Sequence, residues 1–190
     1  MSETRLYTVG RNGDVEIYER FRNAHGGSMA IWRILAEKHL QATGMAFTMM
    51  MMSGLKPVFD LAKKGNLAPW ETVTLMTTFD KVVIPIEHVA SVASALEKFT
   101  EEYGPAQEAQ NFIFHIPQQA EALRKVVEEA EEKGWRGVCW NQMSASEALW
   151  DGIREEGEDE RRPHNVDKDE GHWYWPENKV DEEAAAAVTS

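Results

Sequence analysis

One pattern occurs twice in the middle of the chain: a short apolar run, then a proline, then a stretch with helical periodicity. In the first copy Val82–Ile84 precedes Pro85, and in the second Phe112–Ile116 precedes Pro117, so the prolines are 32 residues apart. Proline suits the first turn of a helix, where its missing N–H would lack an intrahelical partner anyway. A spacing of this size fits one β-α unit. The pattern therefore predicts two consecutive strand-helix units.

A third apolar run completes this pattern. The helices expected at 86–103 and 118–133 carry apolar stripes, and Lys133-Gly134 ends the second helix before Gly137–Trp140. The resulting β-α-β-α-β order predicts right-handed crossovers and a sheet that is at least partly parallel.

The N-terminal segment has the pattern of a β-hairpin. Residues 5–9 and 14–21 alternate between apolar and polar side chains on either side of Asn12-Gly13. Both turn residues accept the positive φ of a type I′ turn, so we expect a tight hairpin. Added to the β-α-β-α-β unit, the hairpin predicts an α/β fold with one mixed sheet and helices packed on it. An α+β fold is the alternative.

Further helices are expected between the hairpin and the first apolar strand. Residues 28–39 have a broad apolar stripe, with Ser28 as N-cap after Gly26-Gly27. A second helix is expected at 54–64, before the stop signal Gly65-Asn66. For residues 70–78 the Thr and Val content favours a strand, whereas Pro69 favours the start of a helix, and both interpretations stay open.

Composition indicates a globular chain from a reducing compartment. Of its 190 residues 43% are hydrophobic, and Cys139 is the only cysteine, so no intramolecular disulfide can form. The N-terminus has no apolar region of a signal peptide, and the longest apolar run, Met45–Met52, is far shorter than the roughly 20 residues of a membrane helix. We expect a soluble, cytoplasmic protein.

Negative charge is concentrated at the C-terminus. Residues 1–150 carry 15 Lys and Arg against 19 Asp and Glu, whereas residues 151–190 carry 5 against 13, within a total of −12. We expect one domain over residues 1–154 and an acidic, aromatic-containing tail over 155–190. Such a charge repels phosphates and favours a partner protein with a basic surface.

The turn between the hairpin and the first helix is the candidate catalytic site. It contains Asn23, His25 and Ser28 around two glycines. Free backbone N–H groups and the helix dipole would favour an anion or nucleotide-like ligand there, with His25 as acid or base and Ser28 as a donor. The structural alternative is a glycine turn followed by an N-cap.

Other reactive side chains give weaker signals. His115 is expected on a half-exposed strand, His88 on a solvated helix face, and Cys139 inside an apolar strand where it acts as a small hydrophobe. No compact His, Cys or carboxylate motif indicates a metal site, and no phosphate-binding glycine motif is present. No cofactor or metal is therefore predicted.

Two apolar segments are candidates for partner binding. The run Met49–Met52 is expected in the core, or in a loop beneath the sheet, with an adaptable partner surface as the alternative. In the tail, His172, Tyr174 and the two tryptophans Trp173 and Trp175 are expected to form a clasp, on the core or on a partner. Residues 155–171 contain almost nothing apolar and are expected to be a mobile linker.

These observations lead to three functional hypotheses. The leading one is a non-enzymatic interaction protein, an inhibitor or adaptor that binds another protein, with a nucleic-acid-mimicking acidic face as one version. The second is a small enzyme with its site at Asn23, His25 and Ser28. The third is a structural subunit of a larger assembly, with homo-oligomerisation left open. Neither direct nucleic-acid binding nor membrane binding is expected.

Overall fold

The computed structural model describes residues 3–22, 25–107, 115–142, 149–153 and 161–175. Its strands and helices occur in the order β1 (Glu3–Gly10), β2 (Val15–Arg22), α1 (His25–Leu40), α2 (Gly44–Met52), α3 (Lys56–Lys63), α4 (Pro69–Met76), β3 (Val82–Pro85), α5 (Ile86–Gln107), α6 (His115–Lys133), β4 (Trp135–Asn141), the 3₁₀ turn η2 (Leu149–Asp151) and β5 (Trp173–Tyr174).

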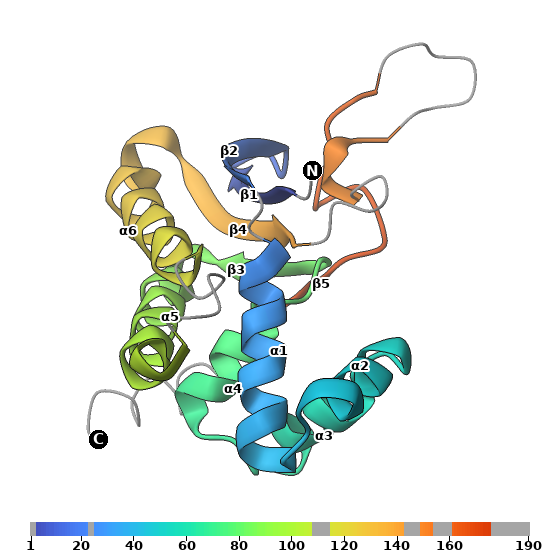
Figure 1. Ribbon diagram of the computed structural model, residues 1–190. Coiled ribbons are helices and arrows are strands. Elements are labelled where there is room, and N and C mark those ends of the chain that lie inside the picture. The colour runs from blue at the N-terminus through green and yellow to red at the C-terminus, as the bar shows by residue number, and fades with distance from the viewer. Residues whose placement is uncertain (1–2, 23–24, 108–114, 143–148, 154–160, 176–190) are drawn as a thin grey trace.

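The main strands form an antiparallel sheet in the order β2-β1-β4-β3 (Figure 1). The two-residue β5 adds to the outer edge of β3 in parallel. The protein is therefore an α+β fold, and the predicted β-α-β-α-β unit is wrong. Strands β3 and β4 are antiparallel neighbours, and the described part of the connection between them consists of the packed helices α5 and α6.

The error lies in the second apolar run. His115 and Ile116 form the first turn of α6, and residues 112–114 lie outside the described part of the chain. A short apolar run is compatible with a strand or with a buried helical segment, and periodicity alone does not separate the two. The other two strands, at Val82–Ile84 and Gly137–Trp140, and the helix at 86–103 are confirmed.

The predicted hairpin is confirmed, but its turn differs from type I′. Gly13 has φ +84°, whereas Asn12 keeps a negative φ. The Gly13 amide donates to the Gly10 carbonyl, 2.9 Å away, so the loop is a four-residue turn closed by one left-handed glycine. A side chain at Gly13 would also collide with Asn165 and Asp167 of the tail.

The two faces of the sheet are covered by different parts of the chain. Leu6 and Trp140 lie opposite each other on β1 and β4, and both face the large core beneath the helices. Tyr7 pairs with Cys139, and both face a second, smaller core together with Val166 of the tail. The alternation of side chains along the strands thus faces two layers: the helices on one side, and on the other a smaller layer that includes Leu149, Trp150 and Val166.

The helices before β3 differ from the sequence predictions in detail. The first begins at His25, so Ser28 lies inside its first turns and is not the N-cap. Residues 69–76 are helical, which settles the segment left open. The helix expected at 54–64 is α3. Figure 1 shows α2 and α3 beside the C-terminal half of α1, at the opposite end of the molecule from the β1–β2 hairpin.

The tail is attached to the hairpin by its backbone. The Val15 amide donates to the His164 carbonyl (2.9 Å), and the Val166 amide donates to the Gly13 carbonyl (2.8 Å). His164, Asn165 and Val166 are buried. The expectation of a mobile linker over residues 155–171 is therefore wrong for this part of it. The predicted boundary at residue 154 lies in a stretch, 154–160, outside the described residues.

Candidate functional site

The turn predicted to be catalytic is only partly described. Asn23 and the side chain of His25 lie outside the described residues. Ser28 is fully buried, and its hydroxyl donates to the side-chain oxygen of Gln142, 3.0 Å away. Thr4 donates to the same oxygen at 3.3 Å. The Ser28 hydroxyl therefore joins α1 to the end of β4 inside the protein.

Gln142 is the centre of this buried polar network. Its side-chain amide donates to the Thr77 carbonyl (3.0 Å) and to Gln119 (3.3 Å), and its backbone amide donates to Asp80 (2.6 Å). Both ends of the Gln142 side chain are thus satisfied by the protein itself, as buried polar groups require. The network fixes the packing of the sheet against the helices.

The aromatic residues of the tail separate into buried and exposed members. Trp175 is 1% exposed, and its amide donates to the Val83 carbonyl, 2.8 Å away. Tyr174 is half exposed, and His172 lies beside His164, with ring nitrogens 3.4 Å apart. The side chain of Trp173 lies outside the described residues. Of the predicted clasp, Trp175 thus binds its own core.

The remaining reactive side chains are buried. Burial raises the pKa of the Cys139 thiol well above its ordinary value, so it stays protonated and unreactive. His115 starts α6 inside the core and His88 is 7% exposed, so the expectations of a half-exposed strand and a solvated face are wrong. Within the described ranges, no three His, Cys or carboxylate side chains gather as metal ligands.

A buried carboxylate cluster joins three helices, and sequence reasoning missed it. Glu71 accepts hydrogen bonds from Tyr103 (2.5 Å), from His39 (2.9 Å) and from the Ala68 amide (2.8 Å). Burial works to raise the pKa of Glu71, but these hydrogen bonds outweigh it and hold the pKa below its ordinary value. Only the pairing of Ala68 with Glu71 leaves a sequence signal, that of a helix start. The cluster clamps α1, α4 and α5 together.

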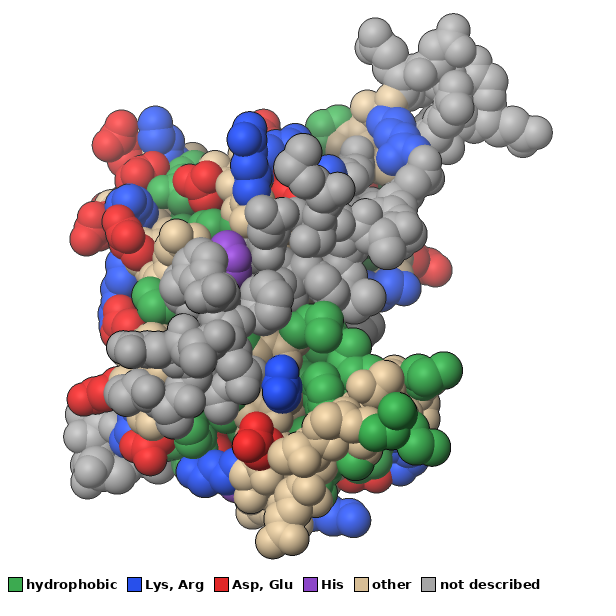
Figure 2. All heavy atoms as spheres, in the orientation of Figure 1, with side chains coloured by type: hydrophobic (Ala, Val, Ile, Leu, Met, Phe, Trp, Pro, Cys, Tyr) green, Lys and Arg blue, Asp and Glu red, His purple; other side chains and the backbone are tan. Residues whose placement is uncertain are grey.

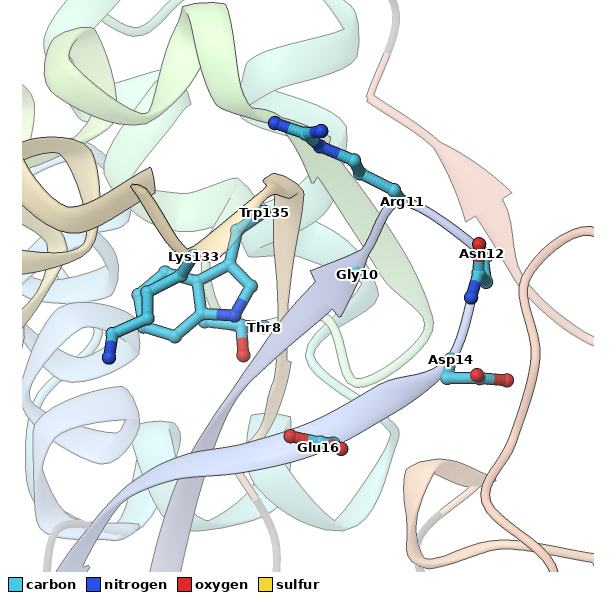
Figure 3. A pocket seen from close by; sticks show the side chains of 8 residues that line it. All are labelled: Thr8, Gly10, Arg11, Asn12, Asp14, Glu16, Lys133 and Trp135. Atoms are coloured by element: carbon cyan, nitrogen blue, oxygen red, sulfur yellow. The ribbon is translucent and has the colours of Figure 1, made fainter. Parts of the chain in front are cut away.

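A shallow polar hollow opens beside the hairpin turn (Figure 3). Asp14 and Glu16 supply negative charge from the β2 side, whereas Arg11 and Lys133 supply positive charge. The Arg11 side chain lies over Gly134, where an added methyl group would meet it. In Figure 3 the charged ends do not converge on one point. The hollow thus shows no preference for a ligand of either sign.

Helix α2 is the exception to the pattern of buried apolar side chains. It consists of Gly-Met-Ala-Phe-Thr-Met-Met-Met-Met and has no charged residue. Its end is sharply defined: Gly54 and Leu55 both have positive φ, the Leu55 amide donates to the Met50 carbonyl, and the Gly54 amide donates to Met51. This pair of hydrogen bonds is a Schellman motif, which stops the helix and leads into α3.

One side of α2 is anchored and the other faces solvent. Phe47 is buried in the core, and Met50 and Met51 pack partly against it. Three methionines are open to solvent: Met45 (75% exposed), Met49 (65%) and Met52 (85%). Their spacing of four and three residues places them in one stripe along the helix. Figure 2 shows hydrophobic side chains gathered on this corner of the molecule.

Three lysines surround Asp60 on α3, the helix that follows α2 in the chain. Lys56, Lys63 and Lys64 are exposed, and all three act on the Asp60 carboxylate. The hydrogen bond from Lys56 (2.6 Å), and then the three positive charges, hold the pKa of Asp60 below its ordinary value. Between Gly44 and Ala68 the chain has three lysines and one aspartate, against −12 for the whole chain.

Comparisons with known proteins do not assign this surface. No family model matches the chain, and no curated protein or solved structure is significantly similar to it. Among the helices of the described residues, none combines the length and the apolar character needed to cross a membrane. The function must therefore be inferred from geometry, and the methionine stripe is the feature that the fold itself does not use. We call Met45, Met49 and Met52 the α2 methionine face.

Proposed function

We propose that this chain is an interaction protein, an inhibitor or adaptor, that binds another protein through the α2 methionine face. The observation that carries the proposal is the exposure of Met45, Met49 and Met52 in one stripe on a helix without charge. Exposed apolar patches on a folded domain are typical of protein-binding surfaces.

In the free protein, the three exposed methionine side chains do not realise the favourable free energy of burial. Full burial of one methionine side chain contributes roughly 1.5–3 kcal/mol, which these three realise only when a partner covers them. Methionine also suits such a role, because its unbranched thioether side chain adapts to partners of different shape. The side of α2 facing the core is held by Phe47, so the stripe is presented on a fixed helix.

The other functional classes receive less support. An enzyme at Asn23, His25 and Ser28 needs the Ser28 hydroxyl free, and that hydroxyl is bonded to Gln142 in the interior. The expected basic partner and the nucleic-acid-mimicking face stay predictions from net charge. Both predictions concern the acidic parts of the surface, because the sequence from Gly44 to Ala68 carries three lysines and one aspartate.

The test is comparative affinity purification with the full-length chain. The triple variant Met45→Glu, Met49→Glu, Met52→Glu is compared with wild type and with a control, Val127→Glu, which places one glutamate at an isolated, 37% exposed apolar position on α6. We expect a defined protein partner to be retained by wild type and by the control and lost from the triple variant. A partner retained equally by all three would contradict the proposal.

A further inference from the structure

We propose that protonation of His164 releases the tail segment 161–175 from the sheet, so that mild acid uncovers the face of the sheet on which this segment packs. The proposal is independent of the α2 methionine face. Two observations carry it: the complete burial of the His164 ring within the tail layer, and the pairing of that ring with a second histidine, His172.

The His164 ring is buried without a hydrogen-bond partner for its Nδ1 atom. The residue is 0% exposed, and its ring packs edge to face with Trp150 of η2, with ring centroids 5.1 Å apart. Within the described structure Nδ1 makes no hydrogen bond, and it lies 3.9 Å from the Asp169 carboxylate, too far for one. A protonated ring carries an N–H at both nitrogens. Protonation in this position would therefore bury a positive charge with one N–H unbonded, which is costly.

The Asp169 carboxylate does not compensate this cost, because its charge is already paired. It accepts two hydrogen bonds from Arg162 and one from the backbone amide of Asn165. Burial lowers the pKa of His164, and this effect outweighs the attraction of Asp169. The positive charges of His172 and Arg162 lower that pKa further. The surroundings of the ring thus favour its neutral form.

The second histidine makes the doubly protonated state worse. Nε2 of His164 lies 3.4 Å from Nδ1 of His172, so one ring can donate to the other only while one of these two nitrogens has no proton. When both rings are protonated, two N–H groups and two positive charges face each other across this distance. The His172 ring also packs against the rings of Trp150 and Tyr174. With the tail in place, the pair therefore holds fewer protons than after release.

His164 lies where the tail is attached to the sheet. Its carbonyl accepts the Val15 amide of β2 (2.9 Å), and its ring partner Trp150 donates to a backbone carbonyl of β4 (2.7 Å). The charged group that the hairpin places here is Asp14, whose carboxylate accepts the side-chain amide of Asn165 (2.7 Å). Movement of the His164 ring toward water would therefore break contacts of the tail layer with both β2 and β4.

The only cysteine of the chain lies beneath this layer and reports whether it is in place. Cys139 of β4 is fully buried, in the smaller core that also contains Tyr7 and Val9 of β1 and Val166 of the tail. A thiol reagent reaches Cys139 only when that core opens. The rate of its modification therefore measures the fraction of molecules in which the tail has left the sheet.

The test is thiol labelling of the full-length chain with dithiodipyridine, a disulfide reagent that stays reactive in mild acid. At each pH the labelling rate is divided by that of the urea-unfolded chain, which corrects for ionisation of the thiol. One proton bound on release enlarges the open fraction about tenfold per pH unit below about pH 6.5. Between pH 7.5 and 5.5 we expect a rise of about tenfold in wild type and in the control His115→Gln, and of less than about twofold in His164→Phe.

A second reporter separates release of the tail from unfolding of the whole chain. In the variant Cys139→Ser, Ala93→Cys the thiol lies on α5, where Ala93 is fully buried in the helical core, and its labelling should stay nearly constant over this pH range. If acid exposes this thiol as much as Cys139, the chain unfolds globally and the proposal is overturned. An equal rise in wild type and in His164→Phe would overturn it as well. If circular dichroism shows that His164→Phe does not fold, His164→Gln, which is polar and cannot be protonated, replaces it with the same expected result.

Discussion

In helix α2 and in the tail segment 161–175, the burial of side chains is the reverse of what composition suggests. The tail segment is rich in charged and polar residues, yet His164, Asn165 and Val166 are buried on the second face of the sheet. Helix α2 has no charged residue and six apolar residues besides Gly44, Ala46 and Thr48, yet three of its methionines face solvent. The polar tail segment therefore covers one face of the sheet, whereas one side of the apolar helix is exposed to solvent.

The difference lies in the surfaces available to each segment. The hairpin turn offers the tail free backbone groups at Gly13 and Val15. The side-chain amide of Asn165 also donates to the backbone carbonyl of Asn12 and to the carboxylate of Asp14. Hydrogen bonds therefore replace apolar burial as the reason for order there. Helix α2 contacts the core through Phe47, Met50 and Met51, and its other side stays open.

The largest effect is expected from shortening Trp175, which is buried in the helical core. Trp175→Ala should lower the free energy of unfolding by about 3–5 kcal/mol, because it empties a site on the helical core. The matched control, Tyr174→Ala, removes a half-exposed ring and should cost within about 0.5 kcal/mol. Urea denaturation of both variants measures this, and equal losses would mean that the tail is held elsewhere.

A smaller effect is expected at the ion pair that closes the tail loop. Asp169 accepts two hydrogen bonds from Arg162 (both 2.7 Å) and one from the Asn165 amide (2.8 Å). Asp169→Asn should cost about 1–3 kcal/mol, because it removes charge-assisted bonds from a side chain that is 6% exposed. Asp167→Asn, at an exposed ion pair with Arg136, should cost less than about 1 kcal/mol. Similar losses for both would contradict the role of Asp169.

Acid should loosen the tail before it unfolds the helices. Burial lowers the pKa of His164, so the folded chain keeps it neutral while the unfolded chain binds a proton below about pH 6.5. Stability should therefore fall as pH drops below that value. Burial lowers the pKa of His115 as well, so His115 also contributes to the fall in the free energy of unfolding as the pH drops. Arg162 lowers the pKa of Asp169, so the stabilisation that this ionised carboxylate contributes to the folded state is lost only below about pH 4.

Hydrogen exchange separates the two histidines. Between pH 7.5 and 5.5, with rates corrected for intrinsic pH dependence, amides in 162–169 should lose protection in wild type. In His164→Phe this loss should be much smaller. An unchanged loss in that variant would assign the effect to His115.

The smallest effect on stability is expected at the methionine face. Met45→Ser, Met49→Ser and Met52→Ser should each change the free energy of unfolding by no more than about 0.5 kcal/mol, because these side chains are already in water. Phe47→Ala, on the other side of the same helix, should cost about 3–5 kcal/mol. Thermal denaturation measures both, and a large loss at Met49 would show that the stripe packs on its own chain.

Local signals account for the elements that sequence predicted. Turn residues around Asn12-Gly13 gave the hairpin, and Pro69 correctly indicated a helix start over the Thr and Val content of residues 70–78. The strand expected at Phe112–Ile116 is wrong at His115 and Ile116, which are helical, because its signal was apolar character alone. The antiparallel pairing of β3 with β4 depends on the two helices between them, which no local pattern records.

The functional features depended on distant contacts and were harder to predict. Glu71 meets His39 and Tyr103, each 32 residues away along the chain, and only folding brings them together. The methionine run was recognised, with a partner surface as the less favoured interpretation. Its expected place in the core is correct in part for Met50 and Met51, which pack against the core, and wrong for Met49 and Met52, which are exposed. Hydrophobicity shows what a segment gains by burial, and it does not show whether the rest of the fold covers that segment.

Methionine oxidation tests the central claim, a solvent-facing stripe that a partner covers, most directly. The full-length chain is treated with dilute hydrogen peroxide, and sulfoxide formation at each methionine is followed by peptide mass spectrometry, with and without the partner protein recovered by affinity purification. Met45, Met49 and Met52 should oxidise faster in the free chain than Met29 and Met76, which pack against the core, and should slow markedly when the partner is bound. Slow oxidation of Met49 in the free chain, or no protection by the bound partner, would contradict the account.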